Sequence, residues 1–346
     1  MTSLETLGLL GVLTLVLVLP FSVRHVEEEL EAFLLVMGAV AVSVSGQWSR
    51  RLVLAMLTDP LALTAAVLVA GAAFRVLRSR VSSWVRSGQE RWGAGPLAFV
   101  LVLGLGLGSA LFTAIVAALV LAEALSALRL PRAVEVRLAI LACFAIGLGS
   151  GLTPLGGPLA AIAVSRLRGA PYHADFWFLT QSLGLVALAV IAALAIAGAW
   201  VAKGPASQAP GLTEDHPESW GDLGKRVLKV YLFVAGLVLL GQGFAPAAEQ
   251  WLLSLSGGLL YWANMASAVL DNATLAAAEV GPQVPPDKLR ALLLGLSLSG
   301  GMLIPGNVPN IVCAAKLRIG AKEWARFGVP VGLGLMLIVY GVLFAF

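Results

Sequence analysis

The segment GLGSGLTPLGGP, residues 147–158, interrupts an apolar stretch that runs from Leu138 to Val164. Proline lacks the N–H donor that a helix needs and glycine is entropically costly in a helix, so continuous helix is unfavourable here. A second segment, SLSGGMLIPGNVPN at residues 297–310, interrupts the apolar stretch from Leu289 to Ala315 in the same way. We expect both segments to unwind, although two packing kinks would carry similar residues.

An unwound segment inside a membrane exposes backbone groups that lipid cannot satisfy, and each bare group costs free energy. Such a segment is tolerated only where protein, water or an ion fills it. Unwound carbonyls and helix C-termini attract cations, whereas exposed helix N-termini attract anions. The two segments are therefore candidates for an ion-binding site.

The rest of the chain has the composition of a membrane protein. Of its 346 residues, 59% are hydrophobic and 12% are charged, whereas about a quarter of the residues in a soluble domain are charged. Basic cytoplasmic loops account for the net charge of +4, so no nucleic-acid partner is expected. No nucleophile, base and orienting group occur together, which argues against an enzyme, and no cofactor is expected. Cys143 and Cys313 lie in apolar stretches without CxxC spacing, so neither a disulfide nor a metal site is implied.

We expect an all-α polytopic fold, since a membrane span needs about 20 apolar residues. Six apolar segments are uninterrupted: Leu7–Val23, Leu30–Ser45, Pro60–Phe74, Phe176–Val201, Val227–Phe244 and Gly328–Phe346. Four are interrupted by glycine, proline or polar residues, and we expect them to form two hairpins (97–123 and 250–280) and two broken helices (138–165 and 289–316). Asp59 is expected to cap the helix that begins at Pro60.

The interrupted regions match in pairs, which indicates an internal repeat. SALFTA at residues 109–114 aligns with SAVLDN at residues 267–272, and the segment from Gly151 aligns without a gap with the segment from Gly301. Chance similarity between two stretches rich in glycine, alanine and leucine is the competing explanation. An odd number of crossings separates the two copies, so the second is inverted. Inverted repeats with discontinuous helices are typical of secondary transporters.

The predicted organisation follows from this repeat. Residues 1–51 form two N-terminal helices, 52–201 the first repeat, 202–226 a cytoplasmic linker and 227–346 the second repeat. Most of the 23 basic residues fall on one side if the segment from Arg75 to Arg91 is cytoplasmic, with Arg50 and Arg51 as exceptions. Both termini are then expected outside. No basic region precedes the first span, so we read it as a mature helix and expect a prokaryotic plasma membrane.

Asp271 is the carboxylate that we expect at membrane depth. An Asp at the bilayer centre costs about 2.5–3.5 kcal/mol on insertion scales, and something must offset this cost. A cation or a proton would do so, and the two would compete for one carboxylate. Alternatively Asp271 or Asn272 caps a half-helix, which is compatible with a binding role. Glu123 and Glu279 are expected to face an interface, with an ion entry path as the alternative.

Two motifs resemble the ion transporter superfamily that includes NhaD-type sodium/proton antiporters, ArsB-type pumps and divalent-anion/sodium symporters. SAVLDN at residues 267–272 is similar to the Ser-Ala-x-x-Asp-Asn element of NhaD-type proteins, and the run from Gly300 to Asn310 adds to the likeness. Within the superfamily the chain looks closest to the uncharacterised predicted cation transporter family, from about Pro60 onward. The resemblance implies a re-entrant hairpin and a broken helix in each half, an ion site where they meet, a homodimer and elevator-like motion. Ala110 follows Ser109, so the Ser-Asn-Thr tip of sodium/dicarboxylate symporters is absent.

The leading hypothesis is a cation/proton antiporter in the lipid bilayer that exchanges Na+ (or Li+) for H+. Its expected cation- and proton-binding residues are Asp271, the Na+ ligand, with Asn272, Ser267, Asn307 and Asn310. Residues expected to support the hairpins and broken helices are Ser109, Thr113, Ser150, Thr153, Gly156, Gly157, Gly301 and Gly306. The alternative is a sodium-coupled anion symporter in which half-helix N-termini hold the anion and Ser109, Thr113 and Thr153 donate to it. A channel or a membrane scaffold is the third possibility.

Overall fold

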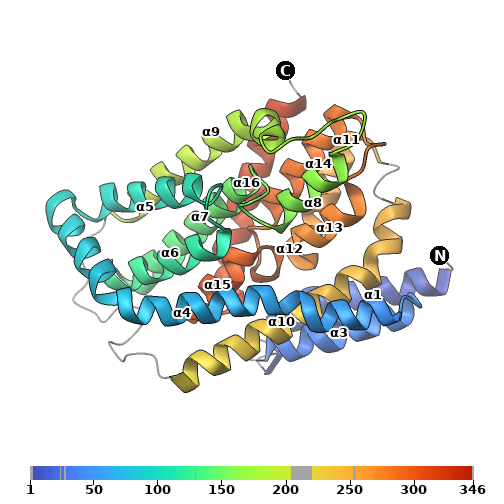
Figure 1. Ribbon diagram of the computed structural model, residues 1–346, viewed down its shortest axis with the longest axis horizontal. Helices are drawn as coiled ribbons and strands as arrows, with labels where there is room; N and C mark the ends of the chain where they lie inside the picture. Colours follow the sequence, from blue (N-terminus) through green and yellow to red (C-terminus); the bar gives the residue numbers. More distant parts are fainter. Residues whose placement is uncertain are drawn as a thin grey trace.

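The computed structural model describes residues 3–23, 25–26, 29–128, 130–203, 220–251 and 255–344, and every regular element in these ranges is a helix (Figure 1). Four helical segments of the described chain are long and apolar enough to cross a membrane: Arg132–Ser150, Phe178–Val201, Val227–Ala247 and Ala321–Phe344. Further apolar helices of 10–17 residues accompany them. The described architecture is all-helical, and its apolar helices are compatible with a multi-pass membrane protein.

Four helices form one side of the molecule, at the bottom of Figure 1. They are α1 (Ser3–Ser22), α3 (Leu30–Val44), α4 (Arg50–Trp92) and α10 (Trp220–Trp251). Glycines let α3 and α10 approach closely, because a Cβ on Gly38 would lie 2.7 Å from the Gly236 carbonyl oxygen, and a Cβ on Gly236 would lie 2.7 Å from the Leu35 nitrogen. Small residues that allow such backbone contact are a common basis of helix association in membranes.

Helix α4 differs from the sequence prediction. It begins at Arg50, where the Ser49 hydroxyl oxygen accepts a 3.1 Å hydrogen bond from the Leu52 N–H. The helix then passes through Pro60, so the expected cap at Asp59 is wrong. Its end is set by Gly93, whose φ of 80° is readily adopted only by glycine. The basic segment after Phe74 is therefore helical rather than a loop.

The remaining helices lie above this layer in Figure 1. One helical pair is α5 (Ala94–Gly108) and α6 (Ala114–Leu128), followed by α7 (Arg132–Ser150), α8 (Pro158–Leu167) and α9 (Phe178–Val201). The second half contains α11 (Gly257–Ala263), the 3₁₀ turn η1 (Asn264–Ala266), α12 (Ser267–Leu270) and α13 (Asn272–Glu279). It ends with α14 (Pro286–Ser299), the 3₁₀ turn η2 (Ile304–Gly306), α15 (Val308–Leu317) and α16 (Ala321–Phe344).

Some predicted segments extend past the described residues. The predicted linker 202–226 contains residues 204–219, which lie outside them, while its last residues belong to α10. Residues 252–254 of the predicted hairpin 250–280 and residues 345–346 of the last predicted span also lie outside the described residues.

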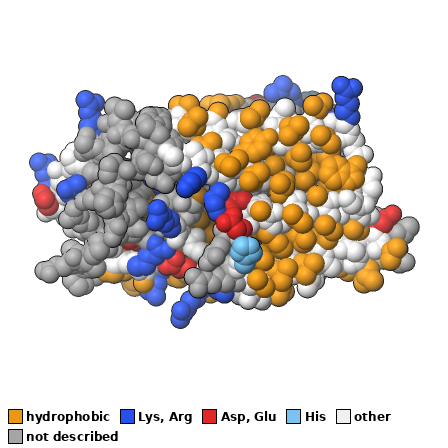
Figure 2. Space-filling model, turned by 90° about the horizontal axis from the view of Figure 1, so that it is seen from below, with side chains coloured by type: hydrophobic (Ala, Val, Ile, Leu, Met, Phe, Trp, Pro, Cys, Tyr) orange, Lys and Arg blue, Asp and Glu red, His pale blue; other side chains and the backbone are white. Residues whose placement is uncertain are grey.

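Hydrophobic side chains cover much of the outer surface. Figure 2 shows a broad hydrophobic area on the face seen from below, with charged side chains toward its margins. Large apolar side chains also protrude from α9 and α16, where Leu185 is 84% exposed and Ile338 is 67% exposed. Single exposed apolar residues are ordinary, but such extended areas are typical of lipid or protein contact.

The contact between α3 and α10 can be tested with Gly236→Ala. The added methyl group meets backbone atoms of α3, so we expect the free energy of unfolding to fall by about 1–3 kcal/mol, measured by denaturant titration in mixed micelles. Gly334→Ala in α16 is the matched control, since a Cβ there has no atom within 4 Å. Equal stability of the two variants would show that α3 and α10 do not pack this closely.

Candidate functional site

The first helix interruption lies between α7 and α8. Helix α7 ends at Ser150, and α8 begins at Pro158 with Gly157 as its N-cap. The Ser109 hydroxyl at the end of α5 donates to the carbonyls of Gly106 (2.7 Å) and Ile146 (3.0 Å). Thr153, inside the interruption, donates to the Ala110 carbonyl. The tip between α5 and α6 is thereby tied to the interruption.

The second interruption lies between α14 and α15. Helix α14 ends at Ser299, and α15 begins at Val308 with Asn307 as its N-cap. The side-chain amide of Asn310 donates to the carbonyls of Gly300 (2.9 Å) and Leu303 (2.8 Å). The Trp324 indole N–H donates to the Gly301 carbonyl at 3.2 Å. These donors satisfy carbonyls that the missing helical turns would have paired.

The two interruptions make matching contacts with the preceding helical tips. A Cβ on Gly156 would lie 2.8 Å from the Ser109 carbonyl oxygen, and a Cβ on Gly306 would lie 2.7 Å from the Ser267 carbonyl oxygen. Because these two residues are glycines, each interruption can pack directly against the backbone of its tip.

The hydroxyl groups of the two tips match as well. Ser109 donates to the Ile146 carbonyl, and Ser267 donates to the Leu296 carbonyl at 3.1 Å. Helix starts agree too: Ala114 and Asn272 begin α6 and α13, while α8 and α15 span corresponding residues. The starts of α6 and α13 are 158 residues apart and those of α8 and α15 are 150 residues apart, which are the offsets at which the sequence segments align.

The two interruptions also lie against each other. A Cβ on Gly147, near the end of α7, would lie only 2.2 Å from the side-chain nitrogen of Asn307. A Cβ on Gly301 would lie 2.3 Å from the Phe144 ring. The Cys143 thiol donates to the Pro309 carbonyl at 3.6 Å, and Cys143 and Cys313 are both free and buried. The centre of the protein is therefore formed by segments from both halves.

Asp271 lies where α12 gives way to α13. Its φ of 60° and ψ of 129° are unusual for a residue with a side chain, and such conformations cost about 1–3 kcal/mol. One carboxylate oxygen accepts from the Thr274 N–H at 3.3 Å and from the Thr274 hydroxyl at 3.4 Å. Asp271 therefore caps α13 and remains half-buried. Capping uses one carboxylate oxygen and leaves a binding role possible.

The other predicted ion-binding residues surround the second interruption. Asn272 is the first residue of α13, and its side-chain nitrogen would be 3.3 Å from a Cβ on Gly300. The Ser267 hydroxyl also contacts the Ser299 hydroxyl at 2.7 Å. The side-chain nitrogen of Asn307 and the side-chain oxygen of Asn310 are buried and have no hydrogen-bond partner.

The predicted supporting residues divide between the two interruptions. Ser150 donates to the Gly147 carbonyl at 2.9 Å, and a Cβ on Gly157 would lie 3.4 Å from the Ser150 hydroxyl. Thr113 differs, because its side chain is exposed and accepts only a long 3.5 Å bond from the Val116 N–H. Thr113 therefore does not join the buried polar residues of the first interruption.

The sequence analysis missed the buried polar residues Asn264 and Ser299, and it did not predict the surroundings of Glu123 and Glu279. Glu279 and Asn264 are both 0% exposed, and Ser299 links α14 to the Asn264 carbonyl at 2.7 Å. Glu123 is buried and pairs with Lys316 of α15 at 2.8 Å. A sequence signal existed for Asn264, an amide in an otherwise apolar stretch, but the partner of Glu123 lies 193 residues away.

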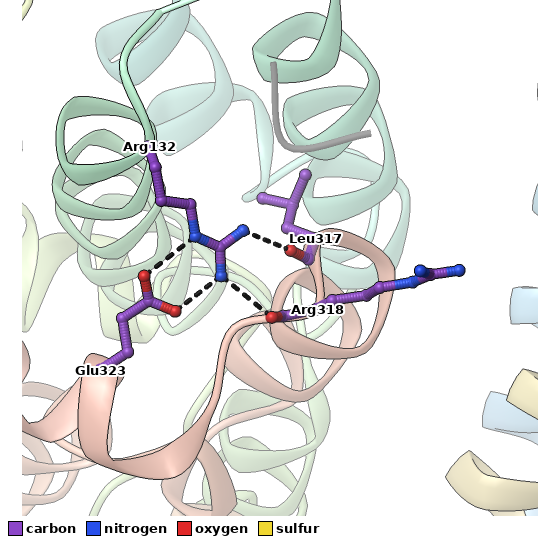
Figure 3. Close-up of polar contacts among 4 residues, drawn as sticks. All are labelled: Arg132, Leu317, Arg318 and Glu323. Atoms are coloured by element: carbon purple, nitrogen blue, oxygen red, sulfur yellow. Dashed lines mark hydrogen bonds and ion pairs between the residues drawn. The ribbon is translucent and has the colours of Figure 1, made fainter. Parts of the chain in front are cut away.

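An arginine joins the two halves at the end of α15 (Figure 3). Arg132, the first residue of α7, donates to the carbonyls of Leu317 (3.1 Å) and Arg318 (3.0 Å). It also forms a two-point ion pair with Glu323 of α16, with distances of 2.9 and 2.6 Å. A guanidinium suits this position because its fixed fork matches a carboxylate while its charge favours helix C-terminal carbonyls.

The centre can serve as a cation site by its chemistry. It combines one carboxylate, side-chain amide and hydroxyl oxygens, and carbonyls at interrupted helix ends, which are the ligands that hard cations prefer. No group of three or more His, Cys, Asp or Glu side chains suited to a transition metal occurs within the described residues. A site of this kind would take an alkali or similar ion.

Comparison with known proteins identifies one family. The model of a family described as "Protein of unknown function (DUF1646)" matches residues 6–346. Among curated proteins, none matches the chain.

The donors at the second interruption can be tested with Asn310→Ala. Two buried carbonyls would lose their partner, and since an unsatisfied buried group costs about 1–3 kcal/mol, we expect the free energy of unfolding to fall by about 2 kcal/mol or more. Asn307→Ala is the matched control at the start of the same helix, because its side-chain nitrogen makes no hydrogen bond. A denaturant titration in mixed micelles that gave both variants the same loss would contradict the assigned role of Asn310.

Proposed function

Because the chain belongs to the DUF1646 family, whose description gives no activity, we propose a function from its site: secondary active transport by cation/proton antiport, most simply Na+ (or Li+) for H+. Asp271 would bind the cation and the proton in turn. The observation that carries the proposal is a strained, half-buried carboxylate beside an interrupted helix of an apolar helical protein. Backbone strain is retained where the surrounding structure enforces it, and such positions cluster at functional sites.

The surroundings of Asp271 support a cation as substrate. Asn272, Asn310 and the carbonyls of the second interruption lie close to the same tip of the chain. Asp271 supplies one negative charge, which a monovalent cation or a proton neutralises. Since both occupy the same carboxylate, binding of one excludes the other, and this exclusion is the basis of exchange.

The matching contacts of the two halves support an inverted-repeat architecture. Ser109 with Gly156 and Ser267 with Gly306 form equivalent tip-to-interruption contacts, which an ancestral duplication explains. We propose that each tip belongs to a re-entrant hairpin. The tips, interruptions and flanking helices would move together against the layer of α1, α3, α4 and α10, as in an elevator, within a homodimer.

One observation favours the alternative, a sodium-coupled anion symporter. Helices α8 and α15 both begin at an interruption, and their N-caps Gly157 and Asn307 supply no side-chain cap hydrogen bond. Uncapped N–H groups at a helix N-terminus attract anions. The two functions differ in the flux that they produce, so transport assays separate them.

The decisive variant is Asp271→Asn, assayed in proteoliposomes loaded with a pH-sensitive dye. Wild-type protein should collapse an imposed pH gradient when Na+ or Li+ is added, and the variant should lose this exchange because an amide carries no exchangeable charge. Asn retains a cap-competent oxygen, so the fold should persist. Asp59→Asn is the control, since Asp59 is exposed on α4. Unchanged exchange by the Asp271 variant rejects the site, and sodium-dependent anion uptake by wild type supports the symporter instead.

Competition at one carboxylate also predicts a pH dependence. As the pH falls, protons occupy Asp271 more often, so the Na+ concentration that gives half-maximal exchange should rise. At saturating Na+ the maximal exchange should be unchanged. A half-maximal concentration that stays constant across the pH range, measured by the same dye assay, would mean that proton and cation do not share a ligand.

A further inference from the structure

A second carboxylate, Glu279, is more deeply buried than Asp271. Its exposed fraction is 0%, and neither carboxylate oxygen has a hydrogen-bond partner. It is the last residue of α13. An ionised carboxylate without partners in an apolar interior carries a large desolvation cost, so a positive charge must accompany it or a proton must neutralise it.

The two ends of α13 provide opposite electrostatic environments for their carboxylates. Asp271 lies at the N-terminus, where the helix dipole favours negative charge and Thr274 donates twice. Glu279 lies at the C-terminus, where the dipole disfavours negative charge and favours a cation. An eight-residue helix separates the two groups by about 12 Å, at 1.5 Å per residue. One ion could not bridge both, so Glu279 requires an explanation of its own.

A polar side chain close to Glu279 is that of Asn264 of η1, without a hydrogen bond of normal geometry between them. Asn264 is 0% exposed, and its side-chain oxygen likewise has no partner. Its nitrogen is committed to the Leu292 carbonyl of α14 at 3.4 Å. Three buried oxygens, two from Glu279 and one from Asn264, are thus left without a donor.

The basic side chain of α8 forms no ion pair with Glu279. Arg166 is exposed, and its guanidinium donates to the Ala277 carbonyl of α13 at 3.0 Å. It occupies the position that matches Lys316, which does pair with a carboxylate, Glu123. The α6–α15 contact therefore contains an ion pair, whereas in the corresponding α13–α8 contact the basic side chain bonds a backbone carbonyl and not Glu279.

We propose that Glu279 and Asn264 form a second cation-binding site, for a monovalent hard cation such as Na+, separate from the site at Asp271. Carboxylate and amide oxygens are the ligands that such cations take, and one carboxylate balances one positive charge. The helix C-terminus adds attraction from its carbonyls. The proposal rests on the proposed function only for the identity of the cation.

The test is the number of Na+ ions bound by the purified full-length protein, counted with radioactive sodium at saturation. Wild type should bind two ions per chain, Glu279→Gln one, Asp271→Asn one and the double variant none. Asp59→Asn should bind two, as a control for loss of an exposed carboxylate. Asn264→Ala should retain two sites but bind one of them more weakly, because a ligand oxygen is gone while the charge remains.

The outcomes separate this proposal from the transport proposal. Loss of one ion in Glu279→Gln, with no loss in Asp271→Asn, supports the second site and contradicts the first. Equal counts for Glu279→Gln and wild type overturn the second site and mean that a proton neutralises Glu279. If Glu279→Gln does not elute as folded protein, the Asn264→Ala titration decides, and two unchanged affinities overturn the proposal.

Discussion

The structure depends on the need to pair backbone carbonyls that two interrupted helices release at its centre. In water these carbonyls would be hydrated, but inside a membrane each must find a protein donor or an ion. Asn310 and Trp324 supply donors at the second interruption, and Ser109 and Thr153 supply contacts at the first. This packing requires glycine at Gly156 and Gly306, because a Cβ at either position would collide with backbone atoms.

The two halves share this architecture but differ in chemistry. Gly156 and Gly306 occupy equivalent places, as do Ser109 and Ser267. Where the second half has Asp271 and Asn272, the first half has Thr113 and Ala114, and Thr113 is exposed. The two halves thus share these packing contacts, whereas the carboxylate of Asp271 has no counterpart at the aligned position of the first half. Both carboxylates that the proposals use, Asp271 and Glu279, belong to the second half.

The contacts between the two halves include two corresponding helix pairs. Helix α6 of the first half packs on α15 of the second, and α13 of the second half packs on α8 of the first. Glu123 and Lys316 form a largely buried ion pair across the former contact, while Arg166 bonds a backbone carbonyl across the latter. Buried ion pairs recover little net stability after desolvation, but removing one partner is costly, so this pair favours one particular packing of the halves.

The sequence alone was sufficient for the membrane class, for the positions where α7 and α14 end, and for the choice of Asp271 as a polar residue at a helical tip. Composition and the glycine and proline positions act locally, so they can be read without a fold. The prediction from sequence misplaced the start of α4, because Ser49 is a good cap and Pro60 can be accommodated inside a helix. Only the tertiary structure revealed that Glu279 lacks a partner, that Glu123 has one, and that Asn307 lies on Gly147. These facts join residues far apart in the chain, and whether a carboxylate is neutralised depends on which distant groups the fold brings within reach.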